Sequence, residues 1–209
     1  MRGMYQPPHF KSEDPAVAAE LMRSHPFASL ISIDDEGLPF VTHLPLHLEE
    51  REGRFHLLGH CARPNPHWRY LQARPTAVVT FLGPHAYQSP RIYADRQRVP
   101  SWNYLAVHCQ VQASLIEDPL AKDRLLKKLI GDHEPPYAEQ WRSLGEEFAH
   151  KMLAGIMAFD LAVTGWQCKL KLNRHRPESH AAMAAGYAQG NEDERELAAW
   201  MKRLELKGI

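Results

Sequence analysis

The sequence predicts a mainly β protein with helices, an α+β fold built on one antiparallel sheet of about six strands. Apolar segments rich in β-branched and aromatic residues recur along the chain, and short turns at residues 34–37 and 49–53 separate the first of them. Amphipathic segments lie between and after these strands. Closure into a small barrel with the helices outside is favoured, because closure removes the exposed edges of an apolar sheet.

The strands are expected at six places in the chain. They span residues 27–33, 39–48, 54–60, 76–82, 101–117 and 154–172. The last of these is expected to break at Gly165, where the side chain is missing. Between the fourth and fifth strands, residues 83–100 read as a long irregular loop rich in aromatic residues and arginine.

Along the chain, helices are expected before, between and after these strands. They span residues 14–24, 65–73, 119–131 and 193–208, and residues 132–153 are expected to hold two short helices. Asp118 followed by Pro119 is a typical helix start, and Gly131 is a typical end. In the terminal helix the apolar residues form a stripe with helical spacing: Leu197, Trp200, Met201 and Leu204.

Composition excludes several classes of protein. The 209 residues are 44% hydrophobic and carry 25 basic and 25 acidic side chains, so the formal net charge is zero, which argues against broad, non-specific nucleic-acid binding. No run of about 18 apolar residues and no apolar signal core is present, so we expect a soluble cytoplasmic protein without a membrane span. The three cysteines form no CxxC pair, which disfavours a disulfide framework or a zinc knuckle: Cys61, Cys109 and Cys168.

The segment GHCARPNPHW, residues 59–68, places a cation between a strand and a helix. Asn65 is a strong N-cap residue, and Pro66 suits the first helical position. Free N–H groups at a helix start attract anions, and Arg63 adds a planar cation suited to phosphate. This stretch therefore indicates a phosphate site, and the alternative is an ordinary capped connection with a solvated arginine.

The second and third strands carry four histidines: His43, His47, His56 and His60. A symmetric turn that pairs Glu49 with Arg54 would place all four on one face of the hairpin. His47 would then lie opposite His56, and His43 opposite His60. Such a face could bind a metal or a haem iron, or it could be a half-solvated face whose imidazoles form hydrogen bonds. No Cys, Asp or Glu lies at ligand spacing, so we assign no metal site.

Five segments together resemble the PaiB family, in the same order and spacing, over residues 4–176. They are FVTHLPL (40–46), GHCARPNPHW (59–68), GPHAYQSPRIY (83–93), VPSWNYLAVH (99–108) and CKLKLNR (168–174). The resemblance implies a dimeric, six-stranded antiparallel split barrel that binds flavin mononucleotide (FMN), similar to the pyridoxamine-phosphate oxidase fold. It also implies that the flavin lies between two subunits, with its phosphate near the end of the third strand.

The resemblance also implies which residues meet the cofactor. Arg63 and Asn65 fall at the phosphate, and residues 42–44 fall where the edge of the isoalloxazine ring would meet the second strand. Trp102 could cover the ring or the dimer seam. The full set of expected cofactor-binding residues is Thr42, His43, Leu44, His60, Arg63, Asn65, Trp102, Lys169, Asn173 and Arg174. No catalytic residue is assigned.

Three residues, at two places in the chain, depart from the family pattern. Lys171 and Leu172 stand where a serine and a glutamine are expected, and Val111 stands where a glycine is expected. The first departure removes a hydroxyl that could bond the cofactor and adds charge to a basic strand end: Lys169, Lys171, Arg174 and Arg176. This strand end could hold a phosphate or form a solvated rim.

Three functions are compatible with this sequence. PaiB proteins are described as negative transcriptional regulators of protease production and sporulation, so the resemblance implies a flavin-binding regulator or redox sensor. Contact with DNA would then involve the C-terminal helices or the arginines of the long loop: Arg91, Arg96 and Arg98. The alternatives are a flavin-dependent oxidoreductase, with His43, His60 and His108 as proton donors, and a haem-binding split barrel.

The chain divides into two expected parts. Residues 1–176 would form the flavin-binding barrel, and residues 177–209 a helical appendage that packs on the barrel or on its dimer partner.

Overall fold

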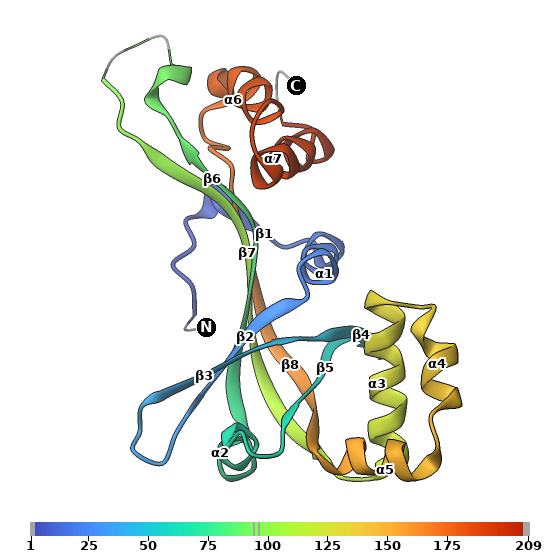
Figure 1. The fold of residues 1–209 in the computed structure, drawn as a ribbon. Coiled ribbons are helices and arrows are strands. Elements are labelled where there is room, and N and C mark those ends of the chain that lie inside the picture. Colours follow the sequence, from blue (N-terminus) through green and yellow to red (C-terminus); the bar gives the residue numbers. More distant parts are fainter. Residues whose placement is uncertain (1–2, 94, 96, 207–209) are drawn as a thin grey trace. The chain divides into compact units, whose positions relative to one another are not determined.

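The computed structural model describes residues 3–93, 95 and 97–206, and Figure 1 shows its fold. Over these residues the chain forms eight strands: β1 (Lys11–Ser12), β2 (Phe27–Ile33), β3 (Pro39–Pro45), β4 (His47–Arg51), β5 (Arg54–Ala62), β6 (Thr76–Gln88), β7 (Ser101–Ile116) and β8 (Ile156–Lys171). Its α-helices are α1 (Pro15–Ser24), α2 (His67–Ala73), α3 (Pro119–His133), α4 (Tyr137–Ser143), α5 (Glu146–Ala154), α6 (His180–Tyr187) and α7 (Glu192–Arg203). Three single 3₁₀ turns complete the described elements: Pro8–Phe10, Pro90–Ile92 and Pro177–Ser179.

The strands form one sheet in the order β3-β2-β6-β7-β8-β5-β4, and the short β1 pairs with β8. The pairs β1–β8, β2–β3, β2–β6, β4–β5 and β5–β8 are antiparallel. The predicted α+β fold with an antiparallel sheet is confirmed, although the sheet has eight strands rather than six. Among the described helices, none is long and apolar enough to cross a membrane.

One of the additional strands arises because the expected strand at residues 39–48 is two strands. At the break, the backbone N–H of Leu46 donates to the carbonyl of Pro26 (3.0 Å), outside the sheet ladder. β3 then pairs with β2, where Thr42 lies opposite Leu30, and β4 pairs with β5. His43 and His47 therefore lie in strands with different partners.

The turn between β4 and β5 corrects the predicted register of the histidine hairpin. Glu52 and Gly53 have positive φ angles of 52° and 73°, the backbone of a two-residue hairpin turn, and Arg51 pairs with Arg54. Glu49 consequently lies opposite His56, and His47 lies opposite Leu58. The predicted pairing of Glu49 with Arg54 was wrong, because it assumed a longer turn.

Several element boundaries differ from those expected, because the elements continue through glycines at which an end or a break was predicted. β6 runs on to Gln88 through a segment predicted as loop. A Cβ added at Gly83 would lie 2.5 Å from Leu21 Cδ1, so the missing side chain serves close packing rather than a turn. β8 shows no break at Gly165, and α3 continues through Gly131 to His133.

Contacts divide the chain into two compact units. Unit 1 contains the described residues within Met1–Ser24, Leu82–Val107 and Gln167–Ile209, and unit 2 contains His25–Phe81 and His108–Trp166. The long strands β6, β7 and β8 contribute residues to both units. The domain boundary predicted at residue 176 stays a prediction.

The core of unit 2 is apolar and covered on one side by helix α3. Leu125 and Leu129 of this helix pack with Leu58 of β5 and Ala158 of β8. Figure 1 shows α4 beside α3, where the indole N–H of Trp141 donates to Asp123 (2.9 Å). The largest fully buried side chains of this unit belong to its strands and to α2: Leu30, Leu57, Leu71, Phe81, Met157, Phe159 and Leu161.

In unit 1 the C-terminal helices α6 and α7 pack on α1 and on the parts of β6 and β7 that belong to this unit. A capping box starts α7: Asn191 Oδ1 accepts from the backbone N–H of Glu194, and the Glu194 carboxylate accepts from the backbone N–H of Asn191. The predicted stripe is confirmed for Leu197, Trp200 and Met201, which are buried. Arg203 forms an ion pair with Glu20 of α1, and Asn103 of β7 donates to the Tyr187 hydroxyl of α6 (2.9 Å).

We expect the substitution Gly59→Ala to destabilise the protein by about 1–3 kcal/mol, because it overpacks the core of unit 2. A Cβ at this position of β5 would lie 2.5 Å from Leu46 Cδ2, 3.2 Å from Leu44 Cδ1 and 3.3 Å from Phe159 Cε2. Urea unfolding would measure the change.

The matched control is Gly131→Ala in α3, where an added Cβ meets nothing within 4 Å and helix propensity favours alanine. A Gly59→Ala variant as stable as this control would show that the core around Leu46 is not tightly packed.

Candidate functional site

A polar cluster forms in unit 2 where β5 ends and α2 begins. The side chains of Asn65 and His67 both meet Thr42 of β3: Asn65 Nδ2 donates to Thr42 Oγ1 (3.2 Å), and His67 Nδ1 lies 2.7 Å from the same oxygen. We call these three residues the Thr42 cluster. The turn itself is held by the backbone, because the N–H of Asn65 donates to Ala62 and the N–H of Arg63 to Gly155, each at 2.9 Å.

The helix start differs slightly from the prediction. α2 begins at His67, whereas a start at Asn65 was expected. The N-cap is Pro66 rather than the predicted Asn65, and Asn65 Oδ1 accepts from the backbone N–H of His67, the first helical residue (3.0 Å). The N–H of Arg69 is bonded to Pro66 (2.8 Å). Both ends of the Asn65 amide are therefore used to shape this turn.

His67 is a buried polar residue that lacks one hydrogen-bond partner. Its exposed fraction is 1%, and burial lowers its pKa to about 4, so the imidazole is neutral near pH 7. Nδ1 has the Thr42 contact, but buried Nε2 has no partner among the described residues. Leaving a buried polar atom unsatisfied costs roughly 1–3 kcal/mol, so this atom is suited to a ligand contact.

Arg63 is an exposed cation at the same turn. Its guanidinium carbon lies 5.8 Å from the centre of the Trp68 ring, and the indole N–H of Trp68 donates to the Arg63 carbonyl (3.0 Å). These contacts orient the side chain. No ion pair with Arg63 is found in the part of the chain that the structure describes, so its charge is available to an anion.

Lys122 of α3 is a second cation near this turn. Its exposed fraction is only 5%, and its ammonium donates to the carbonyl of Ile156 (3.0 Å). Burial lowers the pKa of Lys122, and the positive charge of Arg63 lowers it further, against an opposing effect of Glu117. Two cations that repel each other favour an anion between or beside them.

The sequence analysis did not select His67 or Lys122. The burial of Lys122 could have been predicted from the sequence. Lys122, Leu125 and Leu129 have the i, i+3, i+7 spacing of one helix face, which is the buried face of α3. His67 directly follows the Asn-Pro pair, but nothing local indicates that it is buried. Its burial depends on Phe40 of β3, whose ring meets the imidazole edge to face at 5.1 Å.

The predicted group of residues 42–44 is split between two faces of β3. Thr42 belongs to the cluster, whereas His43 points to the opposite face, where Nδ1 lies 3.0 Å from Ser29 Oγ. Leu44 is 4% exposed and belongs to the core. On β5, His60 has a buried Nδ1 without a partner among the described residues, and burial lowers its pKa.

The other predicted cofactor residues lie in unit 1. Trp102 is 54% exposed and lies near Tyr87, with ring centres 6.1 Å apart. Lys169 is buried, and its ammonium donates to the Tyr5 carbonyl (2.8 Å), while an Arg174 N–H donates to the Lys11 carbonyl (3.3 Å).

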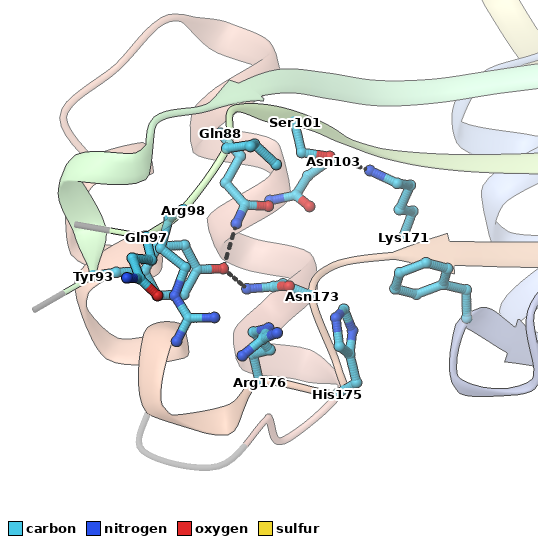
Figure 2. A pocket seen from close by; sticks show the side chains of 12 residues that line it. Gln88, Tyr93, Gln97, Arg98, Ser101, Asn103, Lys171, Asn173, His175 and Arg176 are labelled. Carbon is cyan, nitrogen blue, oxygen red and sulfur yellow. Dashed lines mark hydrogen bonds between the residues drawn. The ribbon is translucent and has the colours of Figure 1, made fainter. Parts of the chain in front are cut away.

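The predicted contact Asn173 and the neighbouring Lys171 line a pocket of unit 1, which Figure 2 shows. Asn173 Nδ2 donates to the Tyr93 hydroxyl (2.6 Å), and the Lys171 ammonium donates to Ser101 Oγ (2.6 Å). Lys171, the departure from the family pattern, is therefore bonded within unit 1 rather than fully solvated.

The four hairpin histidines do not converge on one point. His47 Nδ1 lies 2.6 Å from Asp132, and His56 Nδ1 lies 2.8 Å from Asp160. The predicted facing pairs were wrong, because the register is shifted and His43 lies on β3. In the described residues no group of three or more His, Cys, Asp or Glu side chains could hold a metal ion. The hydrogen-bonding interpretation of these histidines is therefore favoured.

Comparison with known proteins identifies the family. Residues 4–165 match the family described as "Putative FMN-binding domain". The chain is also 34% identical to the protein named "Protease synthase and sporulation protein PAI 2" of Bacillus subtilis (strain 168), over 84% of each chain. The matched segment contains the Thr42 cluster and Arg63 but ends before Lys169, Asn173 and Arg174.

Solved structures agree on the fold. The FAD and heme binding protein of Mycobacterium smegmatis has a TM-score of 0.60 and 21% identity, over 77% of this chain and 73% of that protein. The conserved hypothetical protein Rv2991 of Mycobacterium tuberculosis has a TM-score of 0.57 and 14% identity, over 80% and 91%. The sheet is thus of the split-barrel type, and the chain belongs to the PaiB family of proteins with an FMN-binding domain.

Proposed function

We propose that this chain binds FMN at the turn between β5 and α2 and acts as a flavin-dependent negative regulator of transcription. The observation that carries the binding proposal is the turn itself. It combines an exposed cation without an acidic partner in the described chain, Arg63, with a buried ring nitrogen that has no partner there, His67 Nε2. A molecule that joins a phosphate to a polar ring system would satisfy both.

Arg63 would hold the phosphate. A guanidinium forms charge-assisted hydrogen bonds with phosphate oxygens, and such bonds are stronger than neutral ones. The stacking on Trp68 leaves the guanidinium on the protein surface, where an anion can reach it. A bound phosphate would also offset the repulsion between Arg63 and buried Lys122.

The Thr42 cluster would meet the polar atoms of the flavin. Thr42 fixes the imidazole of His67 through Nδ1, and Asn65 donates to the same hydroxyl, so Nε2 is the ring nitrogen left for a ligand. When bound, FMN supplies hydride and electron chemistry, and the protein supplies position and polar contacts. The remaining predicted contacts stay predictions: His43, Leu44, His60, Trp102, Lys169, Asn173 and Arg174.

A second copy of the chain would complete the site. The register of the sheet places apolar residues on one exposed or half-exposed face, because Ile31 of β2 lies opposite both Val41 of β3 and Val78 of β6. We call this surface the β2 face, and its apolar residues are Phe27, Ile31, Ile33, Val41 and Val78. His43 lies on the same face, so a partner that covers the β2 face would also cover this predicted flavin contact.

The regulatory role is proposed from the PaiB family. The charge of the chain bears on how such a regulator would act. A net charge of zero does not favour extensive contact with phosphates of DNA. In the long loop, Arg98 is paired with Asp95 (2.6 Å), and Arg96 lies outside the described residues. We therefore favour regulation through the redox state of the flavin over broad DNA contact by this loop.

A flavin-dependent oxidoreductase is the second candidate function. Two buried ring nitrogens without described partners, His60 Nδ1 and His67 Nε2, are the observation that favours it. Burial lowers the pKa of both imidazoles, so neutral rings could exchange a proton with a bound substrate. Oxidation of reduced nicotinamide by the FMN-loaded protein would favour this candidate, whereas redox-dependent binding of promoter DNA would favour the regulator.

We expect Arg63→Ala to weaken FMN binding by roughly 1.5–3 kcal/mol, the value of a hydrogen bond to a charged group. Quenching of flavin fluorescence on titration with protein would measure the dissociation constant. The matched control is Arg69→Ala, because Arg69 lies over the same Trp68 ring, at 5.2 Å. Equal dissociation constants for the two variants would remove Arg63 from the phosphate site.

Burial of His67 predicts a pH dependence of stability. Its pKa is about 4 in the folded chain and near 6.5 when unfolded, so the unfolded state binds more protons between these values. The free energy of unfolding should therefore fall as the pH falls from 6.5 to 4, by on the order of 3 kcal/mol from this residue.

Urea unfolding of the flavin-free protein at several pH values would measure this slope. In a His67→Gln variant the slope should be smaller, while the exposed control His133→Gln should keep it. An unchanged slope in His67→Gln would show that His67 is not buried in its neutral form.

We expect Val41→Lys to weaken self-association about tenfold or more, because a dimer would bury an unpaired ammonium from each copy. Val41 is 45% exposed, so the single copy should fold normally. Sedimentation equilibrium would measure the change. The control is Val99→Lys, at a residue of unit 1 that is 80% exposed. Dimers of unchanged affinity would exclude the β2 face as the interface.

A further inference from the structure

Unit 1 contains a pocket of about 320 Å³ whose lining includes one predicted flavin contact, Asn173, but neither Arg63 nor the Thr42 cluster, on which the proposed flavin site rests. Figure 2 shows its lining from β6, β7, the end of β8 and the segment before β7. The residues that matter for its chemistry are Tyr93, Arg98, Asn103, Lys171, Asn173 and Arg176. The volume is at the lower end of the range of about 300–1,000 Å³ for small-molecule sites.

The lining of this pocket is positively charged. Arg98, Lys171 and Arg176 contribute cations, His175 contributes an imidazole, and no Asp or Glu occurs among the described lining residues. Arg98 pairs with Asp95 (2.6 Å), and Arg176 has a longer contact with Glu178 (3.8 Å), but both carboxylates lie outside the lining. The pocket therefore presents an excess of positive charge, which attracts an anion.

The positive groups also repel one another. Burial lowers the pKa of Lys171, and the charge of Lys169 lowers it further. Burial also lowers the pKa of His175, with smaller contributions from His9, Arg176 and Lys171 against Glu178. A bound anion would reverse these effects, because it stabilises the charged form of each group.

Asn103 provides an independent indication of a ligand. It is 1% exposed and lines the pocket. Its Nδ2 is bonded to the Tyr187 hydroxyl and to Met183 Sδ, each at 2.9 Å, but buried Oδ1 has no partner among the described residues. An unsatisfied buried acceptor calls for an N–H or O–H donor.

Tyr93 supplies an oriented donor. Its hydroxyl accepts from Gln88 Nε2 (2.8 Å) and from Asn173 Nδ2 (2.6 Å), and dashed lines in Figure 2 mark both bonds. Because both neighbours donate, the Tyr93 proton is available for an acceptor in the pocket. Ser179 holds Asn173 in place (2.7 Å), and Arg98 lies 4.7 Å from the centre of the Tyr93 ring.

We propose that this pocket binds a small organic dianion that also carries a hydroxyl or amino group. Two negative charges match a lining with three cationic side chains better than one charge does. The donor of the ligand would satisfy Asn103 Oδ1, and the Tyr93 hydroxyl would donate to its anionic group. A phosphate monoester and a hydroxylated dicarboxylate share this chemistry. This site goes beyond the proposed function and does not require the flavin.

Isothermal titration calorimetry of the full chain, with and without FMN, tests the proposal. The probes are glycerol phosphate and malate, which are dianions with a hydroxyl, and succinate, which lacks the hydroxyl of malate. We expect at least one of the first two to bind in both forms of the protein. If malate binds, succinate should bind about tenfold more weakly, because Asn103 Oδ1 would stay unpaired.

Variants locate the binding. Arg176→Gln should weaken the binding probe about tenfold or more, and Arg176→Lys should recover part of the loss. Arg176 is partly exposed, so these variants should keep the unfolding midpoint of the parent protein. The control Arg142→Gln removes an exposed charge from α4, in unit 2, and should leave binding unchanged.

Three results would overturn the proposal. They are no measurable binding of either hydroxylated dianion, equal losses in Arg176→Gln and Arg142→Gln, and loss of binding when FMN is added. The last result would assign the pocket to the flavin site, whereas a failure of FMN binding alone would leave this pocket supported.

Discussion

The candidate flavin site depends on the contacts of one hydroxyl, Thr42 Oγ1, with Asn65 and His67. This hydroxyl joins β3 to the turn that follows β5, two segments that lie far apart in the chain. Through Asn65 it ties β3 to the turn that carries Arg63, and it contacts a neutral imidazole in a buried position. Without this contact neither ring nitrogen would have a polar partner among the described residues, and burial of the imidazole would be more costly.

Polar groups with a structural role and candidate ligand sites differ in their surrounding charges in this protein. On the β4–β5 hairpin, each half-buried histidine meets a carboxylate: His47 meets Asp132, and His56 meets Asp160. At the β5–α2 turn and in the pocket of unit 1, cations gather and a buried polar atom has no partner among the described residues. Both features favour an anionic ligand with polar atoms, because such a ligand supplies what the surrounding residues do not.

Local patterns predicted the strands well where side-chain type and turn chemistry agree. The strand at residues 27–33 has the predicted bounds, and the strand at residues 101–117 ends within one residue of them. The pattern failed at Leu46, where the apolar run continues but the backbone bonds to Pro26. It also failed for the hairpin register, because a change in turn length alters which residues lie opposite one another.

The sequence by itself determined the antiparallel α+β fold, the strand–turn–helix element around Asn65 and the position of Arg63 at its start. These features depend on neighbouring residues, which local propensity and capping describe. Only the tertiary structure decided that His67 and Lys122 are buried beside that turn, that His43 lies on another face, and that Asn103 Oδ1 has no partner among the described residues. Burial and hydrogen-bond satisfaction depend on residues distant in the chain, and no local pattern specifies them.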